Sequence, residues 1–353
     1  CRGPPPHARG APRHPGAMFD FGEMEEHYAR SGDDPAARTL PPLLASPWLG
    51  VTKHNPRARI RLFCMGGVGV PAASFSGWCS EAMHARFPAV EATVLELPGH
   101  GAHEAKPFDD YIACAHAVAA EIERIHFAES DEGEAGGGAQ TRGKGACRPF
   151  AFYGHSLGSR ILAEVAALPL GPRGEHCRKL FVSGRGAPHI EVQQGAFKEK
   201  RPEFERMTAK EVRDIVLNGA LRGSVSQEQL DKYSRWMDAL AKSNPKHLYM
   251  FAEATYGDMC MGTGPHRPSV SHERGVSRCP LHYFHGGADV LWPVKLEGRW
   301  DDLPGTWARY TTAAFSWSEC PGASHGEMGA VESPAFPKIC EDLTRLVATE
   351  SLQ

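Results

Sequence analysis

The chain has 353 residues and 41% hydrophobic content, so it is long enough to bury one large α/β core or two smaller ones. Its formal net charge of −3 argues against nucleic-acid binding, which needs a basic surface. No apolar run approaches the roughly 20 residues that cross a membrane. We therefore expect a cytoplasmic protein with no membrane span.

Ten cysteines occur singly, without a C-x-x-C pair, and this usage is typical of small core residues in a reducing compartment. Eighteen histidines raise the question of a metal site. The sequence contains neither H-E-x-x-H nor a comparable spacing of ligands. It therefore predicts no bound metal.

The first 17 residues are rich in Pro, Arg and Gly and contain no acidic residue. We expect residues 1–39 to form a disordered or poorly ordered extension, and residues 40–353 to form the folded domain. Because the chain begins at Cys1 instead of methionine, its N-terminus looks incomplete, and an organelle-targeting segment is an alternative. The lack of serine in these 17 residues argues against that alternative.

The first predicted strand, at 58–65, runs into the glycine-rich loop 66–69. Glycines let backbone amides approach a ligand closely. A phosphate-binding loop would end in G-K-[ST], which is missing, so an oxyanion-hole loop that uses the Val68 amide is the better interpretation.

A helix at 73–87 and a strand at 90–97 follow this loop, and the strand ends in the turn 98–101. His100 lies in that turn. We interpret it as a polar turn histidine, because the base of a hydrolase comes later in the chain. The next helix is predicted at 108–127, and the Gly- and Glu-rich segment at about 129–147 is predicted to be a flexible insertion.

The central motif lies at residues 148–168, which predict a strand, a sharp turn and a helix. Gly154-His155-Ser156-Leu157-Gly158 matches G-x-S-x-G, and apolar residues at helical spacing follow it. A serine at such an elbow has an exposed hydroxyl that can attack a substrate. The amide of Leu157, at the start of the helix, can face a developing oxyanion.

A second G-x-S-x-G match occurs at residues 322–326. Pro321 immediately precedes it and no helical run follows, so this match lacks the flanking context that the motif demands. We therefore expect Ser156, and not Ser324, to be the nucleophile.

The character of the chain changes at about 192–256, where charged helical stretches are predicted at 207–221, 227–241 and 246–256. We interpret this block as a lid over the active site, with a static helical subdomain as the alternative. Residues 257–278 are polar and predict a surface loop.

Three further strands are predicted at 179–183, 280–285 and 313–319, and a helix at 335–349 closes the chain. A serine nucleophile needs a base, and the base needs an orienting acid. Asp289 follows the second of these strands and His325 the third, in the order that hydrolases use. Asp301 and Asp302 are alternative acids, although no strand immediately precedes them.

Five motifs in the chain are typical of one enzyme family. They are R-L-F-C-M-G-G-V-G at 61–69, L-P-G-H-G at 97–101, P-F-A-F-Y-G-H-S-L-G at 149–158, L-F-V-S-G-R-G-A-P-H at 180–189 and H-G-G-A-D at 285–289. With these motifs, the chain from Arg59 to Leu346 resembles the type II thioesterases of polyketide and nonribosomal peptide synthases. It is also similar to the oleoyl and medium-chain acyl-ACP thioesterases.

The resemblance implies an α/β-hydrolase fold with a mostly parallel central sheet, flanking helices and an inserted helical lid. It implies a serine thioesterase that removes acyl groups from the phosphopantetheine arm of an acyl or peptidyl carrier protein, in editing or release during polyketide, nonribosomal peptide or fatty acid synthesis. The substrate itself carries phosphopantetheine, so no cofactor is expected. By position, Ser156, Asp289 and His325 match the family's triad, and the amides of Val68 and Leu157 match its oxyanion hole.

Two other functions fit the same residues. A carboxylesterase or acyltransferase would use the same triad and the same tetrahedral intermediate. A catalytically inactive hydrolase fold would serve as a binding protein. If a carrier protein is the partner, its acidic surface could meet basic residues clustered near the predicted lid, or these residues could form a merely solvated helix face. The cluster consists of Lys198, Lys200, Arg201, Arg206, Lys210 and Arg213.

Overall fold

A computed structural model describes residues 46–101, 103–128, 148–171, 177–187, 202–220, 227–263, 277–289, 303–329 and 333–350. The predicted N-terminal extension at 1–39 and the predicted insertion at about 129–147 lie outside these ranges. No helix in the described ranges is both long enough and apolar enough to span a membrane.

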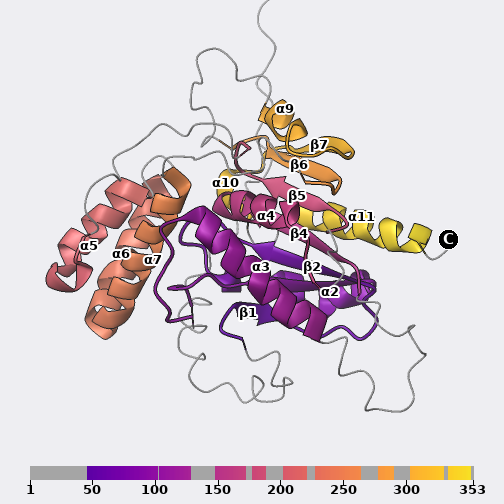
Figure 1. The fold of residues 1–353 in the computed structure, drawn as a ribbon. Helices are drawn as coiled ribbons and strands as arrows, with labels where there is room; N and C mark the ends of the chain where they lie inside the picture. The colour runs from indigo at the N-terminus through magenta and orange to yellow at the C-terminus, as the bar shows by residue number, and fades with distance from the viewer. Residues whose placement is uncertain are drawn as a thin grey trace, which may run out of the picture.

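The described chain is built around a seven-stranded sheet with the strand order β1-β3-β2-β4-β5-β6-β7 (Figure 1). The strands are β1 (Leu49–Thr52), β2 (Ile60–Met65), β3 (Val90–Leu95), β4 (Phe150–His155), β5 (Leu180–Ser183), β6 (Leu281–Gly286) and β7 (Phe315–Cys320). All neighbours pair in parallel except β1, which is antiparallel to β3. The predicted α/β class with a mostly parallel sheet is confirmed.

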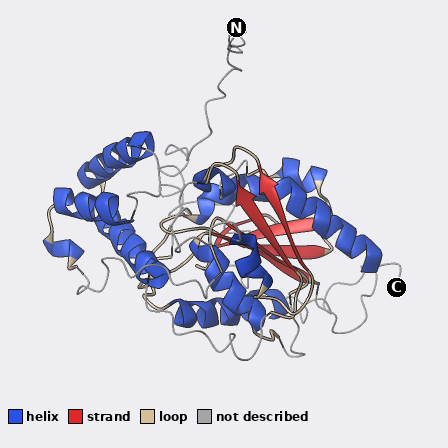
Figure 2. Cartoon of the chain, turned by 90° about the horizontal axis from the view of Figure 1, so that it is seen from above, coloured by secondary structure: helices blue, strands red, loops and turns tan. Residues whose placement is uncertain are grey.

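Helices cover both faces of this sheet (Figure 2). Side chains alternate along β2: Phe63 and Met65 pack in one core with α3 (Tyr111–Ala128) and α4 (Leu157–Ala167). Ile60, Leu62 and Cys64 pack in the other core with the 3₁₀-helix η3 (Ala72–Cys79) and with α11 (Ala335–Glu350). The near-continuous apolar strands of the sequence thus fill two cores, as strands buried on both faces require.

A separate helical block lies to one side of the sheet (Figure 1). It consists of η5 (Phe204–Arg206), α5 (Ala209–Ile215), the π-helical turn η6 (Val216–Ala220), α6 (Gln227–Ser243) and α7 (Pro245–Thr263). It has a core of its own, which includes Phe204, Trp236 and Phe251. The predicted helical stretches are therefore present, while their action as a lid stays a prediction.

Helix boundaries differ from the predictions in two places. The helix expected at 73–87 is divided into η3 and α2 (Glu81–Arg86), because the Ser80 hydroxyl accepts a hydrogen bond from the Met83 amide and starts a new helix. Helix α7 continues to Thr263, so the prediction of a loop from residue 257 was wrong for its first seven positions. A glycine is needed at position 257 of this helix, because a Cβ there would lie 2.6 Å from the Phe108 carbonyl oxygen.

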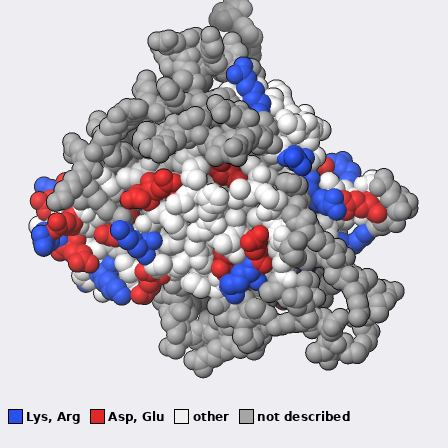
Figure 3. Space-filling model, in the orientation of Figure 1, with Lys and Arg blue, Asp and Glu red and all other residues white. Residues whose placement is uncertain are grey.

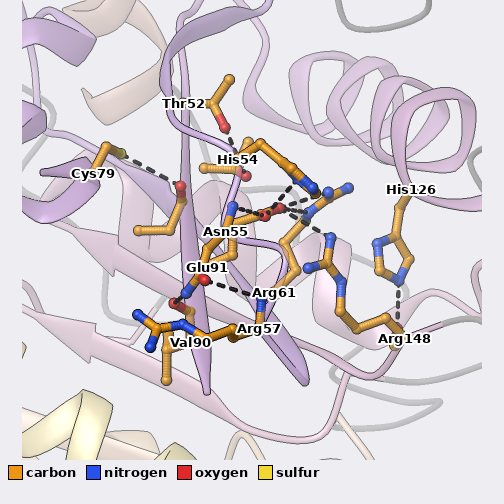
Figure 4. A network of polar contacts seen from close by, with 12 residues as sticks. Thr52, His54, Asn55, Arg57, Arg61, Cys79, Val90, Glu91, His126 and Arg148 are labelled. Carbon is orange, nitrogen blue, oxygen red and sulfur yellow. Dashed lines mark hydrogen bonds and ion pairs between the residues drawn. The ribbon is translucent and has the colours of Figure 1, made fainter. Parts of the chain in front are cut away.

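A buried ionic network joins the strands at the sheet edge where β2, β3 and β4 begin (Figure 4). Both Oε atoms of Glu91 accept hydrogen bonds: Oε1 from Arg61 at 2.7 Å and from Arg148 at 3.0 Å, and Oε2 from the Asn55 amide at 2.8 Å. Although burial raises the pKa of Glu91, these partners hold it at about 2. The network fixes the edge of the sheet that lies away from the candidate site.

Candidate active site

Ser156 occupies a strained position between β4 and α4. Its φ of 52° and ψ of −116° are unusual, and within the described residues it is the one non-glycine residue with a positive φ. The backbone is held there because the Ser156 amide donates to the Ser183 carbonyl of β5 at 2.9 Å. Such conformations cost about 1–3 kcal/mol and cluster at active sites. The predicted strand-turn-helix elbow is therefore present.

The two glycines of the motif are required by close backbone approach. A Cβ on Gly154 would lie 2.5 Å from the Ser159 Cα, and a Cβ on Gly158 would lie 2.6 Å from the Gly66 carbonyl oxygen. The Gly158 amide instead donates to that carbonyl at 3.0 Å. The glycines therefore let α4 pass directly over the ends of β2 and β4.

Asp289 and His325 come from neighbouring strand ends and meet at the same edge. The His325 Nδ1 lies 2.9 Å from the Asp289 Oδ2. The carboxylate is 3% exposed and the imidazole 15%, so water screens this pair only weakly. His325 begins the short helix α10 (His325–Met328). This pairing is the geometry of an acid that orients a histidine base.

The His325 imidazole lies beside the nucleophile strand. Its ring centroid is 4.6 Å from that of His155, the residue before Ser156. Within the described residues there is no hydrogen bond between the Ser156 hydroxyl and His325. Catalytic hydrogen bonds are often long without substrate and shorten in the reacting complex.

His155 is itself buried, and its Nδ1 shares a hydrogen bond of 2.9 Å with the Ser183 hydroxyl. Burial lowers the pKa of His155 well below its usual value, and the neighbouring His325 lowers it further. These effects favour the neutral form of His155.

The glycine-rich loop after β2 lies close to Ser156. A Cβ on Gly67 would lie 2.9 Å from the Ser156 Cβ and 3.3 Å from its Oγ. Val68 follows in a tight turn, which the hydrogen bond from the Val70 amide to the Gly67 carbonyl closes at 3.2 Å. On the other side, Leu157 is the first residue of α4, and the first amides of a helix have no acceptor within it.

The second G-x-S-x-G serine has a different role. Ser324 caps α10 with an ordinary φ of −78°, and its hydroxyl donates to the Glu327 carboxylate at 2.7 Å. The expectation that no helix follows this match was wrong, because the four residues of α10 do follow. The alternative acids Asp301 and Asp302 lie outside the described residues.

His100 lies in the predicted turn, but it is buried. It is 5% exposed, and its Nε2 lies 2.9 Å from the Asp258 Oδ2 on α7. The described part of the chain contains no group of three or more His, Cys, Asp or Glu residues that could hold a metal ion. His100 thus forms a second His–Asp pair, distinct from that of His325.

Comparison with known proteins relates this geometry to thioesterases. No family model matches the chain. Thioesterase PikA5 of Streptomyces venezuelae is 29% identical over 143 residues, which are 40% of this chain and 43% of that protein. The gramicidin S biosynthesis protein GrsT of Aneurinibacillus migulanus is 29% identical over 144 residues, 40% of this chain and 47% of that protein. The chain thus spans less than half the length of these relatives.

Solved structures extend the likeness to most of the chain. The RedJ thioesterase from the prodiginine pathway of Streptomyces coelicolor has a TM-score of 0.53 at 21% identity and covers 90% of this chain and 98% of its own. The chain has the α/β-hydrolase fold. The type II thioesterase BorB of the borrelidin cluster has a TM-score of 0.51 at 19% identity, covering 84% and 97%. The predicted resemblance of the chain to type II thioesterases is confirmed.

Sequence reasoning missed three polar residues around the candidate site. His155 and Ser183 lie inside motifs that the resemblance used, but no pattern predicted that they would contact each other. Asp258 was assigned to a loop. The continued helical spacing of buried residues after Tyr256 was the signal that could have extended α7 as far as Asp258.

The basic cluster of the helical block is partly neutralised where the structure describes it. Arg206 forms an ion pair with Glu203, and Arg213 forms one with Asp238 at 2.7 Å. Lys and Arg side chains of this block lie among Asp and Glu side chains on the face shown in Figure 3. Lys198, Lys200 and Arg201 lie outside the described residues, so a basic docking surface stays a prediction.

Proposed function

We propose that this protein is a serine thioesterase that hydrolyses acyl thioesters on the phosphopantetheine arm of an acyl or peptidyl carrier protein. The observation that most supports the proposal is the strained Ser156 elbow, which stands at the same sheet edge as the paired His325 and Asp289. In this role Ser156 is the nucleophile, His325 the general base and Asp289 its orienting acid.

The chemistry starts with proton transfer from Ser156. The hydrogen bond between His325 Nδ1–H and Asp289 leaves Nε2 without a proton and able to accept one. As Nε2 takes the hydroxyl proton, Oγ attacks the thioester carbonyl carbon and a tetrahedral oxyanion forms. When this intermediate collapses, the C–S bond breaks and the imidazolium returns the proton to the phosphopantetheine sulfur. The acyl group is left on Ser156.

Water completes the cycle. His325 takes a proton from a water molecule, and the resulting hydroxide attacks the acyl-serine carbonyl. When the second tetrahedral intermediate collapses, its bond to Oγ breaks, the imidazolium of His325 returns the proton to Oγ, and the carboxylic acid is released. The sequence consumes one water per thioester and uses no cofactor beyond the phosphopantetheine that the substrate carries.

The oxyanion would be stabilised by the backbone amides of Val68 and Leu157. Leu157 is at the start of α4, where the helix dipole also favours negative charge. Val68 follows Gly67, which is so close to Ser156 that a Cβ on Gly67 would lie 2.9 Å from the Ser156 Cβ. Removal of one such donor costs about 10²–10³ in kcat in serine hydrolases.

The type of substrate is suggested by the relatives. Their names place them in gramicidin S, prodiginine and borrelidin biosynthesis, and PikA5, RedJ and BorB are named thioesterases. By analogy, this protein would clear or release acyl groups from the carrier proteins of a synthase, and the helical block α5–α7 would act as a lid over the acyl chain.

A matched substrate panel tests the proposal. One acyl group is presented on a carrier protein, on CoA and as a nitrophenyl ester, and the series is repeated over increasing acyl length. We expect kcat/KM to be at least tenfold higher for the carrier substrate. A preference for the ester would instead indicate a carboxylesterase. Absence of turnover together with no labelling by a fluorophosphonate would indicate an inactive binding protein.

A further inference from the structure

A single carboxylate of the helical block reaches into two loops of the sheet. The Asp258 Oδ2 on α7 accepts a hydrogen bond from the Gly69 amide at 2.8 Å, and it lies 2.9 Å from the His100 Nε2. Asp258 is 1% exposed. The contact therefore lies inside the protein, where such bonds are stronger than at the surface.

The two loops follow neighbouring parallel strands. Gly69 lies after β2 and His100 after β3, and these strands pair along their whole length. Helix α7 carries Asp258 near one end, while Leu248 and Phe251 nearer its other end belong to the core of the helical block. One continuous helix thus connects that block to the edge of the sheet on which Ser156 lies.

The bond to Gly69 controls the turn that contains Val68. Gly69 is the third residue of the turn that begins at Gly67, and its φ is +64°, as a type II turn requires at this position. In such a turn the peptide between the second and third residues has a defined orientation. The Asp258 carboxylate holds the N–H of this peptide, so the turn cannot flip without breaking the bond.

Val68 lies between two fixed neighbours. Gly67 contacts Ser156, and Gly69 is bonded to Asp258. The amide proposed as an oxyanion donor is therefore held on one side by the nucleophile and on the other by α7.

The surroundings of Asp258 show that the carboxylate is costly to bury. Its Oδ1 has no hydrogen-bond partner within the described residues, nor has the nearby Thr255 Oγ1. An unsatisfied buried polar atom costs about 1–3 kcal/mol. The Gly69 amide and His100 offset this cost, because both would lose their partner if the carboxylate were replaced by an apolar side chain.

The charged and titratable groups around the pair are His100, Glu96, His103 and Cys114. Burial lowers the pKa of His100, but Asp258 and Glu96 raise it to about 9. His100 is therefore an imidazolium at neutral pH. It pairs with the Asp258 carboxylate and holds it in place as an acceptor for Gly69.

We propose that Asp258 is a positioning residue that fixes the Val68–Gly69 turn, so that the Val68 amide is directed at the oxyanion while α7 is docked on the sheet. This inference rests on the proposed function, in which Ser156 is acylated and Val68 is a donor. The contact of α7 with the sheet then affects kcat, because it orients the Val68 amide.

Two substitutions separate positioning from general stability. Asp258→Ala removes the acceptor of the Gly69 amide and the ion pair with His100. Asp258→Asn removes the ion pair but keeps an oxygen that can accept from Gly69. Glu253→Gln, on the same helix, is the matched control. Each variant is assayed with a nitrophenyl ester and with an acyl thioester, at a temperature at which circular dichroism shows it to be folded.

We expect Asp258→Ala to lower kcat about 10- to 100-fold with KM within twofold, because only the transition state carries the oxyanion. Asp258→Asn should restore kcat to within about fivefold of wild type, although both variants have a similarly lowered Tm. Glu253→Gln should match wild type. If the alanine variant does not fold, Asp258→Leu fills the same space without an acceptor and gives the same comparison.

Other outcomes overturn the inference. One is a wild-type kcat in Asp258→Ala. The other is an equal loss of kcat in Asp258→Ala and Asp258→Asn, in proportion to their loss of Tm. Ser156→Ala is assayed in parallel. If Ser156→Ala retains turnover, the proposed function itself fails. If Ser156→Ala is inactive and Asp258→Ala is not impaired, only the role of Asp258 is rejected.

Discussion

His325 and Asp289 are 36 positions apart in the chain, yet His325 Nδ1 lies 2.9 Å from Asp289 Oδ2. Strands β6 and β7 bring them together, because the two strands are parallel neighbours and both end at the same edge of the sheet. The loop after each strand then needs only a few residues to place its side chain.

The first prediction concerns this pair. Asp289→Asn keeps the size of the side chain but no longer fixes the imidazole tautomer, so we expect kcat to fall about 10³- to 10⁴-fold with little change in Tm. The control is the double variant Asp301→Asn/Asp302→Asn, which should keep its activity. If the double variant loses activity and Asp289→Asn does not, the orienting acid has been wrongly assigned.

A second prediction compares glycines of the two G-x-S-x-G matches. Gly158→Ala places a Cβ 2.6 Å from the Gly66 carbonyl oxygen, and backbone atoms cannot rotate away, so unfolding in urea should show a loss of about 3 kcal/mol. Gly322 has a φ of +73° but nothing within 4 Å of a built Cβ. Gly322→Ala should therefore cost only about 1 kcal/mol of backbone strain. Equal losses would contradict the close approach of α4 to β2.

A third prediction concerns acid stability. Glu91 has a folded pKa of about 2 against 4.5 when unfolded, so its contribution is present above pH 4.5 and is lost as pH falls toward 2. A shift of this size corresponds to about 3 kcal/mol. We expect Glu91→Gln to lower the free energy of unfolding by about that amount at pH 7 and by much less at pH 3.

The control for this measurement is Glu81→Gln. Glu81 forms an exposed ion pair with Lys53, and exposed pairs contribute little. Its substitution should leave the urea midpoint close to that of wild type at either pH. A constant difference between wild type and Glu91→Gln from pH 7 to pH 3 would show that the charge of Glu91 is not what stabilises the fold.

A fourth prediction concerns alkaline stability. The folded pKa of His100 is about 9 against 6.5 when unfolded, so its contribution is complete below pH 6.5 and is lost as pH rises through 9. Burial raises the pKa of nearby Glu96 from 4.5 to about 7. The free energy of unfolding therefore falls as pH rises from 4.5 to 7, and Glu96 changes it little at higher pH. Buried cysteines such as Cys64 and Cys114, whose thiol pKa values burial raises, also lower stability as pH rises through 9, so the effect of His100 is the difference between wild type and His100→Gln from pH 7.5 to 9.5.

In that interval, the urea midpoint of wild type should fall more steeply than that of His100→Gln. The two curves should converge at the alkaline end, where wild type has lost at most about 3 kcal/mol. Parallel curves across this interval would mean that the His100–Asp258 ion pair is absent in solution.

The sequence predicted the parts of the fold that depend on local pattern. Strong apolar runs such as that of β4 were found, because a strand buried on both faces is apolar throughout. β1 was missed, since it is four residues long and follows a proline-rich stretch, and its place depends on antiparallel pairing with β3. α10 was missed because four residues give no helical period.

The candidate triad could be predicted because hydrolases of this kind place the nucleophile, the acid and the histidine in a fixed order along the chain. Asp289 and His325 could be chosen because each follows a strand, and the structure brings the two together. The contacts of Asp258 and His155 could not be predicted, because both depend on which loops meet in space. The burial and partner of His100 could not be predicted, because its partner lies 158 positions away on α7.

The most direct test of the account is to find the residue that carries the acyl group. A short reaction with an acyl thioester is quenched in acid, and the modified peptide is identified by mass spectrometry. Ser156→Ala is compared with Ser324→Asn, which removes the other motif serine but keeps a good helix cap. We predict the acyl group on Ser156 in wild type and in Ser324→Asn, with neither acylation nor turnover in Ser156→Ala. Continued turnover by Ser156→Ala, or an acyl group on another residue, would contradict the account.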